Sequence, residues 1–369
     1  MLALALGACN SAEPDPGGDD DDAPDAPDGC DPCAYTPAVT ASDFTTLPDF
    51  TITSSVADRT LPVLIRYPTD ATAPLGVVLW AHGGAWSNNS QNSNEDWSTV
   101  LAEAGYAVVH WSTVAPDDDQ LAQMCIDAGV TDPTLCDDLS LAPEAGEDDQ
   151  GDNPFNAIAI ARPGDGRTIL DALPGFAAQF EGAGIEVDFS RPVVAGWSGG
   201  SQVALQLAGA TRDLAESLPP WSDPSDVPVA FIALSPQGPG FRGFYAADDG
   251  TSWDAVRGAT LVVTGDCDEK VANDLTGPIR REAYENMPAG DKRLLYSTLP
   301  KSDEAKHATF NLDGLASEDD DVLALTDALI SLVVAFTDAH AREDAPAQDW
   351  LDRDDVLTMV DGSGEWLSK

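Results

Sequence analysis

A serine in a glycine-rich turn is the first residue here whose surroundings suggest chemistry. Ser198 stands in Gly196-Trp197-Ser198-Gly199-Gly200, between the apolar run 192–195 and a helical stretch that starts at 201. Glycines let a strand reverse tightly into a helix, and the serine then takes strained backbone angles with its hydroxyl exposed above the sheet. The pattern predicts that Ser198 is a nucleophile and that the Gly199 N–H donates to a developing oxyanion.

A second glycine motif follows the apolar run 77–81 and reads His82-Gly83-Gly84-Ala85-Trp86. Such a loop brings backbone N–H groups close to a substrate carbonyl and supplies the second oxyanion donor. We assign this donor to the Gly84 N–H, with Gly83 or Ala85 as its neighbours. His82 is interpreted as a hydrogen-bonding organiser of the loop. Trp86 and Trp197, which lie in the two glycine motifs, are expected to line the substrate pocket.

A serine hydroxyl is a weak nucleophile, so it needs a base that a carboxylate orients. The chain has four histidines. His110 ends an apolar run, which suits a structural role, and His340 lies in the apolar-periodic final helix. His307 occupies a polar loop after the last expected strand and is the predicted base.

The orienting acid is expected at the end of the preceding strand, where Thr264-Gly265-Asp266-Cys267-Asp268 offers two candidates. The order Ser, Asp, His along the chain is a known arrangement for such sites. We prefer Asp268, because it lies one turn beyond the strand end, whereas Asp266 would still be leaving the strand. Asp266 remains the alternative. Cys267 is interpreted as a packed or paired thiol rather than a nucleophile.

Short apolar runs alternate with helical stretches along most of the chain. This pattern predicts an α/β fold with a mostly parallel central sheet of about eight strands and helices on both faces. The expected strands are 50–56, 61–67, 76–81, 106–111, 192–195, 229–234, 260–264 and 293–298. The clearest expected helices are 201–210, 279–287 and 321–340.

The expected organisation is a catalytic domain at 41–345, flanked by two terminal segments. Residues 10–40 are rich in Asp, Pro, Gly and Ala, a composition that predicts a disordered acidic tether. Residues 346–369 are treated as a C-terminal tail. The stretch 116–153 has many carboxylates, two cysteines and few strand signals. It is expected to form a lid-like insertion over the carboxyl edge of the sheet, with a mobile surface loop as the alternative.

The first nine residues form a short apolar segment that ends in Leu6-Gly7-Ala8-Cys9. This segment predicts a signal peptide, and its end resembles a bacterial lipoprotein box in which Cys9 is lipidated. A plain secretory signal is the alternative, and both predict an exported protein, either lipid-anchored to the bacterial membrane or cell surface or secreted. Export permits disulfides. The preferred pair is Cys125 with Cys136, and Cys30 with Cys33 is a further possible pair.

The charge balance excludes one class of partner. There are 64 acidic and 18 basic residues, for a formal net charge of -46. Binding to phosphate backbones needs clusters of Lys and Arg, so no nucleic-acid partner is expected. The excess acid is interpreted as a solvated surface that keeps the protein soluble, with adaptation to high salt as a sharper alternative. No metal site is expected either, because the Cys30-x-x-Cys33 pair lacks a second pair of ligands.

Several of these motifs together resemble bacterial α/β-hydrolases related to platelet-activating-factor acetylhydrolase and dienelactone hydrolase. The resemblance covers about residues 50–340 and includes the segment 59–68, the two glycine motifs, Arg162-Pro163-Gly164-Asp165, and the loops of Asp268 and His307. It implies an α/β-hydrolase fold that hydrolyses carboxylic esters, small or polymeric, through an acyl-enzyme without a metal or organic cofactor. Apart from the resemblance, no run after position 10 approaches the roughly 20 apolar residues of a membrane span, so contact with a membrane is expected only through an N-terminal lipid anchor.

Two departures from the family leave the activity open. Dienelactone hydrolases carry cysteine where this chain has Ser198. The residues on either side of the serine, Trp197 and Gly199, are also similar to those of polyester hydrolases and prolyl-oligopeptidase-type peptidases. A serine peptidase or amidase is therefore one alternative. A noncatalytic surface lipoprotein that keeps the hydrolase scaffold is another.

Overall fold

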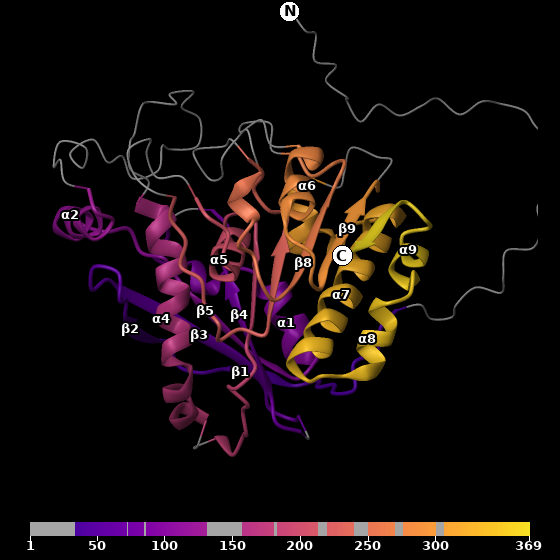
Figure 1. Ribbon diagram of the computed structural model, residues 1–369. Coiled ribbons are helices and arrows are strands. Elements are labelled where there is room, and N and C mark those ends of the chain that lie inside the picture. Colours follow the sequence, from indigo (N-terminus) through magenta and orange to yellow (C-terminus); the bar gives the residue numbers. More distant parts are fainter. Residues whose placement is uncertain are drawn as a thin grey trace, which may run out of the picture.

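The computed structural model describes residues 34–71, 73–84, 86–130, 157–180, 183–212, 220–239, 250–269, 276–299 and 306–369. These residues form a mixed α/β structure around one ten-stranded sheet (Figure 1). The strands are β1 (Phe44–Thr46), β2 (Phe50–Thr53), β3 (Thr60–Pro68), β4 (Gly76–Ala81), β5 (Tyr106–Trp111), β6 (Val193–Trp197), β7 (Ala230–Leu234), β8 (Ala259–Gly265), β9 (Lys292–Ser297) and β10 (Gly364–Ser368). The α-helices are α1 (Glu95–Glu103), α2 (Asp118–Asp127), α4 (Ala157–Phe180), α5 (Gly199–Ala208), α6 (Gly277–Asn286), α7 (Asp320–Ala341), α8 (Ala345–Leu351) and α9 (Asp355–Met359).

The central strands of the sheet are parallel and its edges are antiparallel. The order is β1-β3-β5-β4-β6-β7-β8-β9-β10, with β2 paired to β3. The six neighbouring strands β5, β4, β6, β7, β8 and β9 run parallel, whereas β1, β2, β3 and β10 pair antiparallel.

All eight strands expected from the sequence are present, but the expected number of strands is too low. The two additional strands, β1 and β10, are short edge strands without a continuous apolar run, the feature that identified the buried strands.

Helices cover both faces of the sheet, as the continuous apolar strands require. Alternate side chains of β4 show this arrangement, because Val78 and Trp80 pack in the core cluster with α1, α7 and α8. Val77 and Leu79 pack on the opposite face with α4, α5 and α6. Each face therefore has its own apolar core, and the strand ends between the two cores are held at fixed positions.

Helix α7 is the longest element of the first core. Its length and apolar composition alone would allow it to cross a membrane, but its most apolar 18-residue stretch is 78% buried in the body. It lies alongside α8 beside the sheet (Figure 1). This environment is that of a core helix in a globular protein.

Both ends of the described chain pack against α7. The hydroxyl of Tyr35 donates to Asp338 of α7 at 2.8 Å, and its ring lies 6.0 Å from the ring of Trp350. Residues 34–40, the end of the expected tether, therefore contact the body, while 10–33 lie outside the described residues. The segment 346–369 supplies most of α8, all of α9 and the edge strand β10, so it completes the sheet instead of trailing from it.

The first part of the expected lid, 116–130, contains α2. Asp117 caps this helix by accepting a hydrogen bond from the Gln120 N–H, and Met124 packs with the start of α4. Cys125 is disulfide-bonded. Its expected partner Cys136 lies outside the described residues, as does the rest of the insertion, so the pairing and the lid remain predictions.

We expect Trp350→Ala to lower the free energy of unfolding by about 3 to 5 kcal/mol, because it removes a large buried side chain and leaves a cavity beside α7. Urea denaturation followed by circular dichroism measures this. The matched control is Leu315→Ala, at an exposed apolar position, which should change stability by no more than about 0.5 kcal/mol. Equal effects of the two substitutions would contradict the packing of the C-terminal segment.

Candidate active site

Ser198 lies at the turn between β6 and α5, in a backbone conformation that serine rarely adopts. Its φ is 54° and its ψ is -121°. An added Cβ at Gly200 would overlap the carbonyl oxygen of Ala81, and one at Gly196 would overlap the backbone of Gly200. The glycines on both sides therefore let β6, α5 and β4 approach closely enough to hold this strained turn.

The structure brings the three side chains predicted from the sequence into one hydrogen-bonded chain. The His307 Nε2 lies 2.8 Å from the Ser198 Oγ, and the His307 Nδ1 lies 2.8 Å from the Asp268 Oδ1. Because a carboxylate only accepts, the Nδ1 carries the hydrogen and the Nε2 is left to accept from the serine hydroxyl. This is the arrangement in which an imidazole can remove a proton from a serine.

Asp268 is fully buried and has a partner for each oxygen. The Thr264 hydroxyl donates to Oδ2 at 2.8 Å, and the Ser235 Oγ lies 2.6 Å from both oxygens. The Arg280 Nε lies 3.2 Å from Oδ1 and also donates to the Asp268 carbonyl at 2.9 Å. Burial lowers the pKa of the Arg280 guanidinium, and the Asp268 charge opposes that effect. The carboxylate is thus held by a cation and two hydroxyls.

Asp266, the alternative acid, points elsewhere. It accepts a hydrogen bond from the Tyr296 hydroxyl at 2.7 Å, whereas Asp268 contacts His307. Burial, together with the hydrogen bond that the Tyr296 hydroxyl donates to Asp266, raises the pKa of Tyr296. Of the two candidates, Asp268 is therefore the one in contact with the His307 imidazole.

The two tryptophans expected to line a pocket have different surroundings. The Trp197 ring lies 4.8 Å from the imidazole of His307, and its Nε1 donates to the His307 carbonyl at 3.1 Å. Trp197 therefore braces the base. Trp86 is half-buried and packs with the cluster formed by α2 and the start of α4, with the Arg59 guanidinium 6.0 Å from its ring. Contact of either ring with a substrate remains a prediction.

A buried arginine holds the His82-Gly83-Gly84 loop. The Arg162 guanidinium, from α4, donates to the carbonyl oxygens of His82 and Gly84. Burial lowers the pKa of Arg162 to about 10, which leaves it charged at neutral pH. Two peptide groups of the loop are thereby oriented by one rigid, bidentate donor.

His82 is bonded to the backbone on both sides of its ring. Its Nδ1–H donates to the Gly83 carbonyl at 2.7 Å, and its Nε2 accepts from the Thr113 N–H at 3.2 Å. Burial and the charge of Arg162 lower the pKa of His82 to about 3, so the ring is neutral. With both nitrogens engaged, His82 has no proton-accepting site left for Ser198.

The two glycines assigned to the oxyanion site lie next to each other. Gly84 has a φ of 71°, and an added Cβ at Gly199 would overlap the Gly84 carbonyl oxygen. Gly199 is the first residue of α5, where free N–H groups and the helix dipole favour negative charge. Ala85, the further neighbour expected here, lies outside the described residues. Oxyanion binding by these N–H groups remains a prediction.

A second buried network lies on the same helix as Arg162. One turn further along α4, Asp165 pairs with Arg59 and accepts from the Ser54 hydroxyl at 2.6 Å. Burial raises the pKa of Asp165, and the Arg59 charge opposes this. The network fixes the start of α4 against the segment between β2 and β3, and so fixes the position of Arg162.

Reasoning from the residues missed several groups that hold the site, namely Arg162, Ser235, Thr264 and Arg280. Arg162 entered only through the family resemblance. Arg162, Ser235 and Arg280 make their contacts with residues at least 12 positions away in the chain, whereas Thr264 donates to Asp268 only four residues further on. No local pattern indicates such partners.

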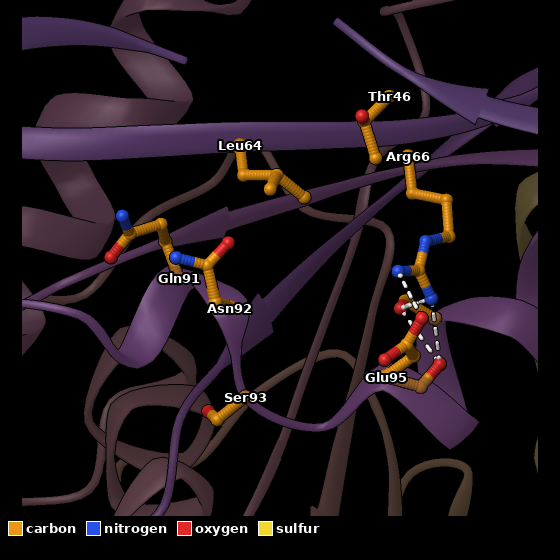
Figure 2. Close-up of a pocket in the computed structure, with 8 residues that line it drawn as sticks. Thr46, Leu64, Arg66, Gln91, Asn92, Ser93 and Glu95 are labelled. Carbon is orange, nitrogen blue, oxygen red and sulfur yellow. Dashed lines mark hydrogen bonds and ion pairs between the residues drawn. The ribbon is translucent and has the colours of Figure 1, made fainter. Parts of the chain in front are cut away.

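The described residues contain no group of three or more His, Cys, Asp or Glu side chains that could hold a metal. A polar cavity of about 290 Å³ lies at a different place, beside β1 and β3, and Figure 2 shows Arg66 turned toward Glu95 in its wall. Arg66 donates there to the Glu95 carboxylate at 3.0 Å and to the Ser98 hydroxyl at 2.8 Å. Its cation is already paired, and we assign no ligand to this cavity.

Comparisons with known proteins do not place the chain in a family. No family model matches it, and no curated protein matches it. The site is therefore interpreted from its own geometry.

We expect His110→Leu to flatten the pH dependence of stability in the acid range. His110 is buried, and burial together with the charge of Arg66 lowers its pKa to about 3. Below its ordinary pKa of about 6.5 the unfolded chain binds a proton that the folded chain does not. Stability therefore falls by up to about 1.4 kcal/mol per pH unit as the pH drops from 6.5 towards 3.

Between pH 6.5 and pH 5 the variant should gain roughly 1.5 kcal/mol relative to the wild type. Urea denaturation at several pH values measures the difference, and the wild type at each pH is the reference. If the free energies of unfolding of wild type and variant changed in parallel with pH, His110 would accept a proton in the folded protein.

Proposed function

We propose that this protein is an exported serine hydrolase with an α/β-hydrolase fold, which cleaves carboxylic esters through an acyl-enzyme intermediate. The observation that carries the proposal is the continuous hydrogen-bonded chain from Ser198 through His307 to Asp268, with both distances at 2.8 Å. A noncatalytic scaffold has no need for a strained serine aligned with a base and a buried acid. The choice of esters rests on the family resemblance.

The arrangement of the site on the sheet supports the fold assignment. The nucleophile follows β6, the acid follows β8 and the base follows β9, so the three appear along the chain as Ser, Asp, His. This order, with the serine at a strand-to-helix turn, is typical of α/β-hydrolases. The antiparallel strands at one edge and the parallel order of the rest are compatible with that fold.

In the proposed cycle the Ser198 Oγ attacks the ester carbonyl carbon while the His307 Nε2 takes the hydroxyl proton. Asp268 keeps the imidazole in its orientation and stabilises the imidazolium. The N–H groups of Gly199 and Gly84 receive the oxyanion. The protonated Nε2 then passes its proton to the leaving alcohol. Water, deprotonated by His307, attacks the acyl group and releases the acid and free Ser198.

Export and lipid attachment at Cys9 are part of the proposal and depend on the sequence alone, because residues 1–33 lie outside the described residues. The substrate is a small or polymeric ester. A panel of p-nitrophenyl esters, a polyester film and peptide anilides separates esterase, polyester hydrolase and peptidase activity. Cleavage of anilides at a rate comparable with that of esters would favour the peptidase alternative.

The test of the nucleophile is labelling by a fluorophosphonate probe. We expect the wild type to be labelled stoichiometrically and Ser198→Ala to lose both labelling and ester hydrolysis, since the probe reacts only with an activated serine. Ser225→Ala, which removes another buried serine hydroxyl, is the matched control and should label like the wild type. A folded wild-type protein that the probe does not label would favour the scaffold alternative.

We expect Arg162→Met to lower kcat roughly tenfold to hundredfold with little change in KM, because the freed loop no longer presents the Gly84 N–H in one orientation. Steady-state kinetics on a p-nitrophenyl ester measures both constants. The control is Arg293→Met, which removes another buried guanidinium whose partners are the Leu351 carbonyl and the Asp352 carboxylate. Arg293→Met should lower stability more than kcat, and a folded Arg162→Met protein with wild-type kcat would contradict the role of the clamp.

A further inference from the structure

Ser235 is a buried serine that the proposed cycle does not use. It directly follows β7, whose carboxyl end lies between those of β6 and β8 in the sheet. The strand before it brings Ser198 to the same edge, and the strand after it leads to Asp268. Ser235 has no exposed surface.

The Ser235 hydroxyl bridges the acid and the base. Its Oγ lies 2.6 Å from each carboxylate oxygen of Asp268 and 2.6 Å from the His307 Nδ1. A hydroxyl has one hydrogen to donate and lone pairs that accept. Since the carboxylate only accepts, the hydroxyl hydrogen points to Asp268 and the oxygen faces the Nδ1–H. That hydrogen therefore has two acceptors, Asp268 and Ser235.

The backbone of Ser235 is held in a conformation that places this hydroxyl. Its φ is 52°, in the left-handed region that is uncommon for serine. Its N–H donates to the Val263 carbonyl at 2.7 Å, and its carbonyl accepts from the Arg280 Nη1 at 3.0 Å. Arg280 is also the cation beside Asp268. The same contacts that anchor the acid thus hold the strained residue beside it, and strain of this kind is a reason to look for a role in function.

We propose that Ser235 is a positioning residue and the fourth member of the hydrogen-bonded chain, which fixes the Asp268 carboxylate and shares the Nδ1 hydrogen of His307. This inference rests on the proposed function. The donated hydrogen bond prevents the carboxylate from rotating away from His307. The hydroxyl dipole also has its negative end at the imidazole, so it stabilises the imidazolium that forms when Ser198 is deprotonated.

Two substitutions at position 235 separate the effect of the hydroxyl from the effect of the backbone conformation. Ser235→Ala removes the hydroxyl and keeps the unfavourable φ, whereas Ser235→Gly removes the hydroxyl and relieves it. We expect both variants to lose roughly fivefold to fiftyfold in kcat with KM within about twofold of the wild type. The acid limb of the pH profile of kcat/KM should move to lower pH, because the imidazolium has lost a stabilising dipole. The control is Ser225→Ala, in the segment that precedes the start of β7, and it should leave kcat and the pH profile unchanged.

A structural role predicts a different pattern. Ser235→Gly would then be at least as stable and as active as the wild type, and the pH profile of Ser235→Ala would not move. Either result, in variants whose circular dichroism matches that of the wild type, overturns the proposal.

A measurement that does not need turnover keeps this test independent of the proposed function. The proton on the His307 Nδ1, observed at low field by NMR and assigned with His307→Gln, should shift in Ser235→Ala because it loses one of its two acceptors. An unchanged resonance overturns the inference even if the wild type is a hydrolase. A shifted resonance in a protein that the fluorophosphonate probe does not label would uphold the bridge and reject the catalytic role.

Discussion

The burial of the Asp268 carboxylate is the constraint on which the rest of the site depends. A charge without exposed surface is strongly destabilising unless hydrogen bonds and an opposite charge replace its water. Thr264, Ser235, Arg280 and His307 supply those partners, and they come from four different segments of the chain. The ends of β7 and β8, the helix α6 and the loop after β9 must therefore meet at this carboxylate. The base is held in place as a consequence.

The two apolar cores provide the rigidity that the strained residues require. Ser198 and Ser235 both have positive φ, which costs of order 1 to 3 kcal/mol each and persists only where the surroundings over-determine the backbone. Both directly follow apolar parallel strands, of which β7 is buried throughout and β6 is buried except at the partly buried Trp197. Because the carboxyl ends of parallel strands share one edge of the sheet, this packing also sets the distance between the two residues.

Some of the few basic residues lie inside the protein. The buried ones include Arg59, Arg162, Arg212, Arg280, Lys292 and Arg293. Arg162 holds the glycine loop and Arg280 the acid, so two of these cations act on the site itself. With 64 acidic residues in the chain, the surface is left strongly negative, which favours solubility and makes self-repulsion depend on ionic strength.

Local patterns in the sequence were sufficient for the buried strands, the long core helix and the turn that carries Ser198. Each of these depends on the conformation and burial of neighbouring residues, which apolar runs and glycine spacing report directly. His307 could be chosen because the chain has only four histidines. The choice between Asp266 and Asp268, the edge strands β1 and β10, and the supporting roles of Arg162 and Ser235 depended on the folded structure. These features are contacts between residues distant in the chain, and strand register and helix packing, which no short stretch of sequence encodes, determine which side chains meet.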